Sequence, residues 1–172
     1  MTTYYYSGEV TPAGTPHRPA GQVMYYREVN IPDLIANGGL VDANGNALAV
    51  SSTGFSDEDI LKVFAVPAGT LIRNVAVKVT TPEGGTCTCK IGCQTAAQIH
   101  TAADDDDGWM ADVNLNSAGY DITAHDDGFG TDNFGGILYI TDGYIDLEFN
   151  TDLTAVAVFE IAVDAVEMFP SS

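Results

Sequence analysis

The sequence predicts an all-β fold, a jelly-roll-like β-sandwich with an extended N-terminal arm. Val, Ile, Thr, Tyr and Phe dominate its apolar segments, and these residue types favour strands. Clusters of Gly, Asp, Asn and Pro separate the segments at short intervals, as turns separate strands. No long stretch rich in Ala, Leu, Glu and Lys indicates a major helix. The length of 172 residues suits one domain.

The first half of the chain contains clear strand and turn signals. QVMYYREVNI (22–31) is the first strand candidate, and PDLIANGG after it indicates a turn or one short helical turn. An Asn-Gly pair at 44–45 lies between apolar flanks and predicts a tight hairpin. ILKVFAV (60–66) runs into a Pro-Ala-Gly turn, and TLIRNVAVKVT (70–80) alternates with period two. These segments predict at least three strands.

The second half contains strands with longer interruptions. Residues 95–103 are compatible with one or two helical turns, and the Gly- and Asp-rich stretch 119–136 predicts a long loop. Asp-Gly at 142–143 lies between ILYIT and YIDLEF, which predicts a second hairpin. The last segment, 153–169, is long for one strand and is expected to bend midway.

The N-terminal segment differs from the rest of the chain. TPAGTPHRPAG (11–21) mixes Pro, Gly and Thr, which predicts an extended arm over residues 1–20 and a sandwich domain over residues 21–172. Aromatic side chains on such an arm are good anchors in a partner's groove. The candidate partner-binding residues are Tyr4, Tyr5, Tyr6 and Arg18.

The charge of the chain is strongly negative, with a net charge of −18. No Lys or Arg follows Lys90, whereas sixteen Asp and Glu residues do. Such a surface repels phosphate backbones, so nucleic acid is not expected as a partner. No apolar run reaches the roughly 18 residues of a membrane span. The N-terminus lacks a basic region followed by an apolar one, so we expect folding in a reducing cytosol.

The cysteines in TCTCKIGC (86–93) share one strand face. Cys87, Cys89 and Cys93 are all odd-numbered, as is Ile91, and alternate residues of a strand point to the same side. The outer two lie about 20 Å apart in a strand, too far for one zinc ion. Core packing is therefore favoured over a zinc site with His100, and three cysteines do not make a disulfide scaffold.

An acidic run provides the candidate site for a divalent cation. Placing Gly108 at the sixth position of an EF-hand loop puts Ala103 first and Asn114 twelfth, so the run is not an EF-hand. Solvated loop acids are the favoured interpretation, here and for the second cluster at 125–132. A calcium or magnesium ion bound by the run is the alternative. The residues of the run are Asp104, Asp105, Asp106 and Asp107.

No catalytic signature is present in the sequence. GxSxG, HExxH, Walker and GxGxxG patterns are missing, and the histidines at 17, 100 and 125 belong to no nucleophile or metal motif. The sequence therefore predicts a protein that is not an enzyme and has no cofactor other than the divalent cation discussed above.

The chain resembles the small β-sandwich proteins that decorate or cement the capsids of tailed bacteriophages. The resemblance rests on YYREVNIPDLIANGG, on DEDILKVFAVPAGTLIRNVAVKVTTPEGGTCTCKIG and on DDDDGWMADVNLNSAGY, and it covers residues 21–172. Around the glycine-closed strand this sequence has cysteines where that family usually has Val or Asp. The family carries no catalytic residues to transfer.

The resemblance implies a virion protein on the capsid exterior. Such a protein binds the major capsid protein, often as a trimer, and strengthens the shell against the pressure of the packaged DNA. One alternative is a phage tail or head-fibre component. Another is a carbohydrate-binding β-sandwich module, in which exposed aromatic rings would stack on sugars. The candidate rings for that function are Trp109, Tyr120 and Tyr144.

Overall fold

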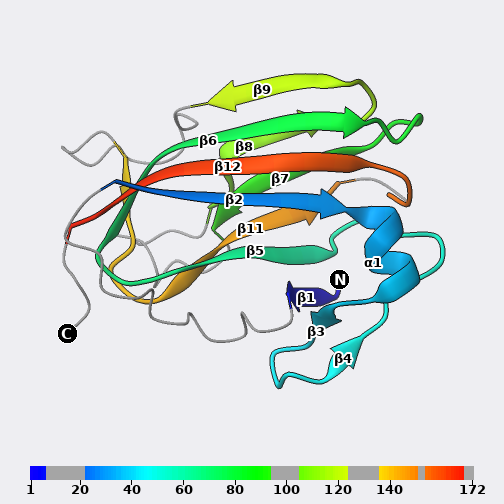
Figure 1. The fold of residues 1–172 in the computed structure, drawn as a ribbon, viewed down its shortest axis with the longest axis horizontal. Helices are drawn as coiled ribbons and strands as arrows, with labels where there is room; N and C mark the ends of the chain where they lie inside the picture. Colours follow the sequence, from blue (N-terminus) through cyan, green and yellow to red (C-terminus); the bar gives the residue numbers. More distant parts are fainter. Residues whose placement is uncertain (7–21, 94–104, 124–135, 151–153, 169–172) are drawn as a thin grey trace.

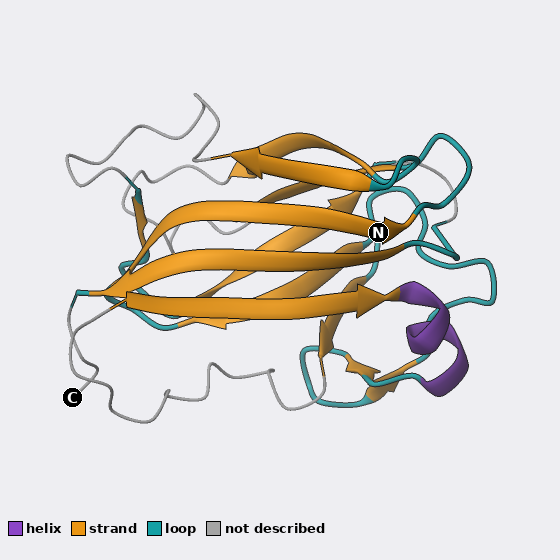
Figure 2. Ribbon diagram, turned by 45° about the horizontal axis from the view of Figure 1, so that its top comes forward, coloured by secondary structure: helices purple, strands orange, loops and turns teal. Residues whose placement is uncertain are grey.

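The protein folds as two β-sheets packed face to face (Figures 1 and 2). The computed structural model describes residues 1–6, 22–93, 105–123, 136–150 and 154–168. Within these ranges the only α-helix is a short one at one end of the sandwich. The prediction of an all-β sandwich is confirmed.

The larger sheet has seven strands in the order β4-β3-β1-β5-β11-β7-β8. Neighbouring strands are antiparallel, except that β1 runs parallel to β5. The strands are β1 (Thr3–Tyr6), β3 (Leu40–Val41), β4 (Ala47–Leu48), β5 (Ile60–Val66), β7 (Thr88–Cys93), β8 (Asp105–Asn114) and β11 (Gly143–Phe149).

The smaller sheet has the order β10-β6-β12-β2, and β9 also pairs with β6. Its strands are β2 (Gln22–Asn30), β6 (Thr70–Thr81), β9 (Gly119–Thr123), β10 (Ile137–Leu138) and β12 (Val158–Glu167). Helix α1 (Ile31–Asn37) follows β2 directly, because Asn30 caps it by accepting a hydrogen bond from the backbone N–H of Asp33. Figure 1 shows β9, β6, β12 and β2 side by side in front of the larger sheet.

Alternation along β6 and β12 fixes which face of the smaller sheet is buried. Val75, Val77 and Val79 are buried, and the neighbouring strand places Val163, Ile161 and Phe159 directly opposite them. Because the side-chain period of a strand is two, the residues between them point away from the core. These cross-strand apolar pairs are buried in the core, which stabilises the fold.

Most strands that the sequence predicts are present at the predicted places. Strand β5 occupies 60–66, and β6 extends the predicted 70–80 by one residue. The Asn-Gly hairpin joins β3 to β4, and Asp42 stabilises its turn by accepting hydrogen bonds from the backbone N–H groups of Asn44 and Asn46. Strand β12 covers most of 153–169, and its pairing with β6 shifts register between Val158 and Phe159 and between Asp164 and Ala165. The bend expected midway stays a prediction.

The prediction of an N-terminal arm outside the sandwich is wrong for the first described residues. Thr3–Tyr6 forms β1, which lies between β3 and β5 in the larger sheet. Tyr4 is buried, and its ring packs edge-on against Phe55 at 5.1 Å between centroids. Tyr4 joins the core and Tyr6 packs against it, because Phe55 and β5 offer them an apolar surface that local composition does not reveal. Residues 7–21 lie outside the described residues.

Two predictions in the second half of the chain are also wrong. The Asp-Gly pair at 142–143 does not close a hairpin: β10 pairs with β6 in one sheet, whereas β11 pairs with β5 and β7 in the other. Asp142 instead accepts a hydrogen bond from the backbone N–H of Ala68. Residues 119–123 of the predicted loop form strand β9, and 124–135 lie outside the described residues, as do 95–103.

Candidate interaction surface

The cysteines are core residues, as their shared parity predicts. Cys87, Cys89 and Cys93 are buried and free of disulfides. Burial, followed by the nearby thiol of Cys87, raises the pKa of Cys89 well above its ordinary value. Such a thiol is a poor nucleophile, because only the thiolate reacts readily. In the described part of the chain, no three His, Cys, Asp or Glu residues lie together as metal ligands would.

The acidic run is placed differently from the prediction of a loop. The backbone of residues 105–107 belongs to strand β8, in which residue 105 stands opposite Cys93. Asp104 lies outside the described residues, as does Arg18. The cation site proposed for Asp104, Asp105, Asp106 and Asp107 therefore stays a prediction.

The outward face of the smaller sheet carries two exposed tyrosines and an exposed methionine. Tyr26 on β2 is 59% exposed, Met24 two residues earlier is 69% exposed, and Tyr120 on β9 is 76% exposed. We name this surface the tyrosine face. It consists of Met24, Tyr26 and Glu28 of β2, Glu160, Ala162 and Asp164 of β12, Asn74, Ala76 and Lys78 of β6, and Tyr120 of β9.

Polar side chains lie between the two tyrosines across four strands. Partial desolvation, together with the nearby carboxylate of Glu160, raises the pKa of Tyr26. Lys78 Nζ lies 3.3 Å from Glu160 Oε2 and 5.7 Å from the centroid of the Tyr120 ring. The hydrogen bond and charge of Glu160 raise the pKa of Lys78. The ammonium group of Lys78 therefore interacts with the face of the Tyr120 ring.

A second ion pair borders the same face. Arg73 Nη2 donates to Asp164 Oδ2 at 2.7 Å, and Gln22 Nε2 donates to Asp164 Oδ1 at 2.9 Å. Between the two ion pairs, Tyr26, Ala162 and Ala76 stand side by side on three adjacent strands. Because the alanine side chains are short, a partner could approach the backbone of β12 and β6 closely there.

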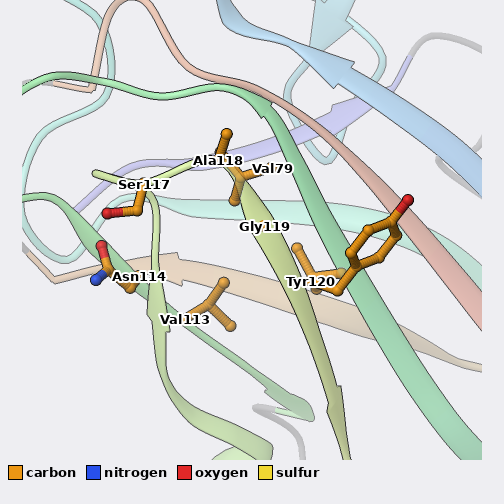
Figure 3. A pocket seen from close by; sticks show the side chains of 8 residues that line it. Val79, Val113, Asn114, Ser117, Ala118, Gly119 and Tyr120 are labelled. Atoms are coloured by element: carbon orange, nitrogen blue, oxygen red, sulfur yellow. The ribbon is translucent and has the colours of Figure 1, made fainter.

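A pocket of about 160 Å³ opens beside Tyr120, between β6 and the connection from β8 to β9. Its apolar floor is formed by Val77, Val79 and Val113, all of which are buried. Figure 3 shows Asn114 and Ser117 on one side of the pocket and Tyr120 on the other. Tyr120 lines the pocket, but it stands opposite Lys78 and points outward, whereas the valines of the floor face the core. The pocket therefore lies on the core side of β6 and β9, at the β9 edge of the tyrosine face.

The three rings considered for sugar stacking have different environments. Trp109 is completely buried in the core, which excludes it from stacking on a sugar. Tyr144 is half-buried and packs edge-on against Tyr5 at 5.5 Å, beneath the ammonium group of Lys62. Tyr120 is the one of the three that is freely accessible.

Every basic side chain that the structure describes is already engaged. Four form ion pairs with carboxylates: Lys62 with Asp146, Arg73 with Asp164, Lys78 with Glu160, and Lys90 with Glu148. The fifth, Arg27, lies with its guanidinium 4.0 Å above the Tyr6 ring. With a net charge of −18, the protein therefore offers a partner an excess of carboxylates.

Tyr26 and Glu160 were not identified from the sequence. The alternation in YYREVN places Tyr25 and Tyr26 on opposite faces of β2, but it does not say which face is outward. The outward direction follows from the pairing of β2 with β12, which places Tyr26 opposite Ala162, 136 positions later in the chain.

No helix in the described residues is long and apolar enough to cross a membrane.

Comparison with known proteins finds similarity at the level of the fold. No protein-family model matches the chain, and no curated protein matches its sequence. A chain in the capsid of Ralstonia phage GP4 superposes with a TM-score of 0.55 at 9% identity, over 96% of this chain and 98% of that one. This similarity shows a shared fold along the whole chain.

Three further solved structures superpose with lower TM-scores. Chains of the cyanophage Pam1 capsid (12% identity, 90% of this chain and 91% of that one) and of the Helicobacter pylori phage KHP30 capsid (10% identity, 87% and 89%) both have TM-scores of 0.48. The IMPa metallopeptidase has a TM-score of 0.30 at 10% identity, with 96% of this chain aligned to 14% of that one. Similarity at these levels carries no argument.

Proposed function

We propose that the protein is a structural component of a bacteriophage head, of the decoration or cement type, and not an enzyme. The observation that carries this proposal is the match in fold to a chain of the Ralstonia phage GP4 capsid over nearly the full length of both chains. The fold alone does not determine function. The tyrosine face supports the proposal, because it is a surface suited to contact a partner.

In this proposal the protein binds the outer surface of the icosahedral shell. Its partner is the major capsid protein, and copies of the protein associate as homotrimers on the capsid exterior. Three copies with a charge of −18 each repel one another. We therefore expect trimers to form on the shell, or at an ionic strength that screens the charges, more readily than in dilute buffer.

Electron cryo-microscopy of the virion that contains this protein tests the proposal. We expect its density on the outside of the head, between capsomers. Heads assembled without the protein should release their DNA at a lower temperature than complete heads. Density confined to the tail or to fibres would instead favour the alternative of a tail or head-fibre component. A virion that lacks the protein would contradict both.

Carbohydrate binding is a second candidate, and Tyr120 is the observation that favours it. The ring is exposed and stands beside a pocket whose rim carries the polar side chains of Asn114 and Ser117. An exposed ring next to polar groups can stack on a sugar while those groups hydrogen-bond its hydroxyls. Binding to a glycan array that disappears with Tyr120→Ala would support this function, and an array without any signal would contradict it.

A further inference from the structure

We propose that the tyrosine face and the pocket at its β9 edge together form the attachment surface of this protein. We also infer the chemistry of its partner: a protein surface with Lys or Arg side chains around a protruding apolar side chain. This inference rests on the proposed function, since it takes the partner to be the capsid shell.

The exposure of large apolar groups on this face is unusual for the outer side of an antiparallel sheet. Such a face normally carries polar, solvated side chains, which alternate along each strand with the apolar side chains of the core. Six large apolar side chains are exposed among the described residues, and Met24, Tyr26 and Tyr120 share this one face. Scattered apolar groups need no explanation. Here Met24 and Tyr26 are neighbours on one face of β2, and the Glu160–Lys78 ion pair lies between them and Tyr120, so aromatic and charged groups stand together as in protein interfaces.

The arrangement of the face suits a binding surface. Tyrosine buries a large area with few rotatable bonds, and it is enriched among the residues that dominate binding energy. The ammonium group of Lys78, which pairs with Glu160, lies 5.7 Å from the centroid of the Tyr120 ring, so the loss of side-chain entropy of this ring on binding is reduced. Tyr26 and Tyr120 lie on strands three inter-strand spacings apart, about 14 Å.

The pocket specifies the apolar part of the partner. Its floor of three valines excludes a charged group, because nothing there would compensate the loss of hydration. An apolar cavity of about 150 Å³ accommodates a benzene molecule, so this pocket has room for one Leu or Phe side chain. The polar rim then meets the partner's backbone or solvent.

The charges specify the polar part of the partner. Glu28 and Glu160 stand directly opposite each other on β2 and β12, and like charges in that position repel. Lys78 pairs with Glu160, so two carboxylates share one ammonium group in this row. A cation supplied by the partner would neutralise Glu28. A second copy of this chain could not readily supply it, because its described cations are engaged in ion pairs or over Tyr6.

Binding to phage shells that lack this protein tests the inference. The wild-type protein is compared with the Tyr26→Ala/Tyr120→Ala double variant. The matched control is Ile140→Ala/Val156→Ala, which removes two exposed apolar side chains outside the face. Because truncating a dominant interface residue weakens binding about 30-fold or more, we expect at least that loss for the tyrosine variant. The control should bind as wild type, and all proteins should keep the same melting temperature.

Two further variants test the charge of Glu28 and the pocket separately. Glu28→Gln should weaken binding by about 5-fold without lowering the melting temperature, because it also removes a repulsion in the free protein. Ala118→Phe places a bulky group at the pocket and should weaken binding similarly. Raising the salt towards about 1 M, where the Debye length is about 3 Å, should weaken attachment to a basic partner. Salt would instead strengthen contact between two copies of this acidic chain.

The outcomes distinguish failure of the inference from failure of the proposed function. If wild-type protein does not bind the shells at all, the proposed function is wrong. If wild-type protein binds and the double tyrosine variant binds equally well, the shell is the partner but this surface is not the attachment site. If binding strengthens with salt, the inferred basic partner is wrong.

Discussion

At the scale of single residues, burial explains the chemistry of the side chains that first suggest a reactive site. Cys89 is completely buried in strand β7, opposite Val113 of β8 and Phe149 of β11. The thiol therefore behaves as a small apolar group. Tyr139 is equally buried, and its hydroxyl donates a hydrogen bond to the backbone carbonyl of Tyr144. Burial raises the pKa of both side chains well above their ordinary values.

These pKa shifts predict that the protein loses stability in alkali. The unfolded thiol ionises above about pH 8.5, whereas the folded thiol of Cys89 stays protonated. The unfolded state therefore binds fewer protons than the folded state above that pH, and the free energy of unfolding falls as the pH rises. The fall should reach about 1.4 kcal/mol per pH unit for this thiol. Below about pH 8.5 the thiol is protonated in both states, so the stability that the buried neutral thiol contributes is fully present.

Urea denaturation between about pH 7 and pH 10 measures this effect. Cys89→Val keeps the apolar contact and removes the ionising group, so its stability should fall less steeply than that of wild type. Parallel profiles for the two proteins would show that Cys89 ionises as readily in the folded state as in the unfolded one.

Parity along a strand allowed the environment of the cysteines to be predicted, but not that of Lys62. The sequence of β5 shows Lys62 between apolar residues, which by alternation suggests a solvated side chain. The structure buries it with Asp146, at 2.6 Å between Nζ and Oδ2. A register shift between Ile145 and Asp146 aligns the pair, and such shifts depend on pairing between distant segments.

At the scale of secondary-structure elements, local signals predicted strands better than they predicted pairing. The valine alternation of β6 and the Pro-Ala-Gly turn after β5 fixed both strands nearly to the residue. The crossover from β10 to β11 was missed. An Asp-Gly pair between two strands has the same sequence whether the strands pair with each other or belong to different sheets. The outward face of β2 was missed for the same reason: partners distant in sequence decide it.

Strand β1 differs most from its sequence prediction, because a segment expected to be a free arm lies inside the larger sheet. Its packing leads to a stability prediction. Tyr4→Ala should lower the free energy of unfolding by about 3–5 kcal/mol, as expected for truncating a buried aromatic residue. The lost contacts are those with Phe55, which itself stacks on Phe149 at 4.5 Å. Tyr5→Ala is the control, because Tyr5 is only half-buried and should cost about 1 kcal/mol.

Chemical denaturation of the two variants measures the difference. Removal of residues 1–6 should destabilise the protein at least as much as Tyr4→Ala, because β1 connects the β3–β4 hairpin to β5. A truncated protein as stable as wild type would restore the alternative, in which this segment is a free arm available to a partner.

At the scale of the whole molecule, the net charge of −18 opposes the compact fold. The described basic residues are used inside the molecule, in ion pairs or over an aromatic ring, so they leave the remaining carboxylates uncompensated. Self-repulsion of this kind keeps a protein soluble and separate at high concentration. It also makes attachment to a basic surface favourable, because the partner supplies the missing positive charge.

The same charge predicts that cations stabilise the free protein. Sodium chloride should raise the melting temperature by screening the repulsion, and a gain of about 1 kcal/mol corresponds to roughly 2–4 °C for a chain of this size. Calcium at matched ionic strength should raise it further if Asp104, Asp105, Asp106 and Asp107 bind the ion, because binding to the folded state stabilises it by mass action.

Asp105→Asn/Asp107→Asn should then lose the calcium increment and keep the effect of sodium. The charge-matched control, Asp57→Asn/Asp112→Asn, alters two exposed carboxylates elsewhere and should keep both. Equal melting temperatures in calcium and sodium at the same ionic strength would show that these carboxylates are solvated and bind no ion.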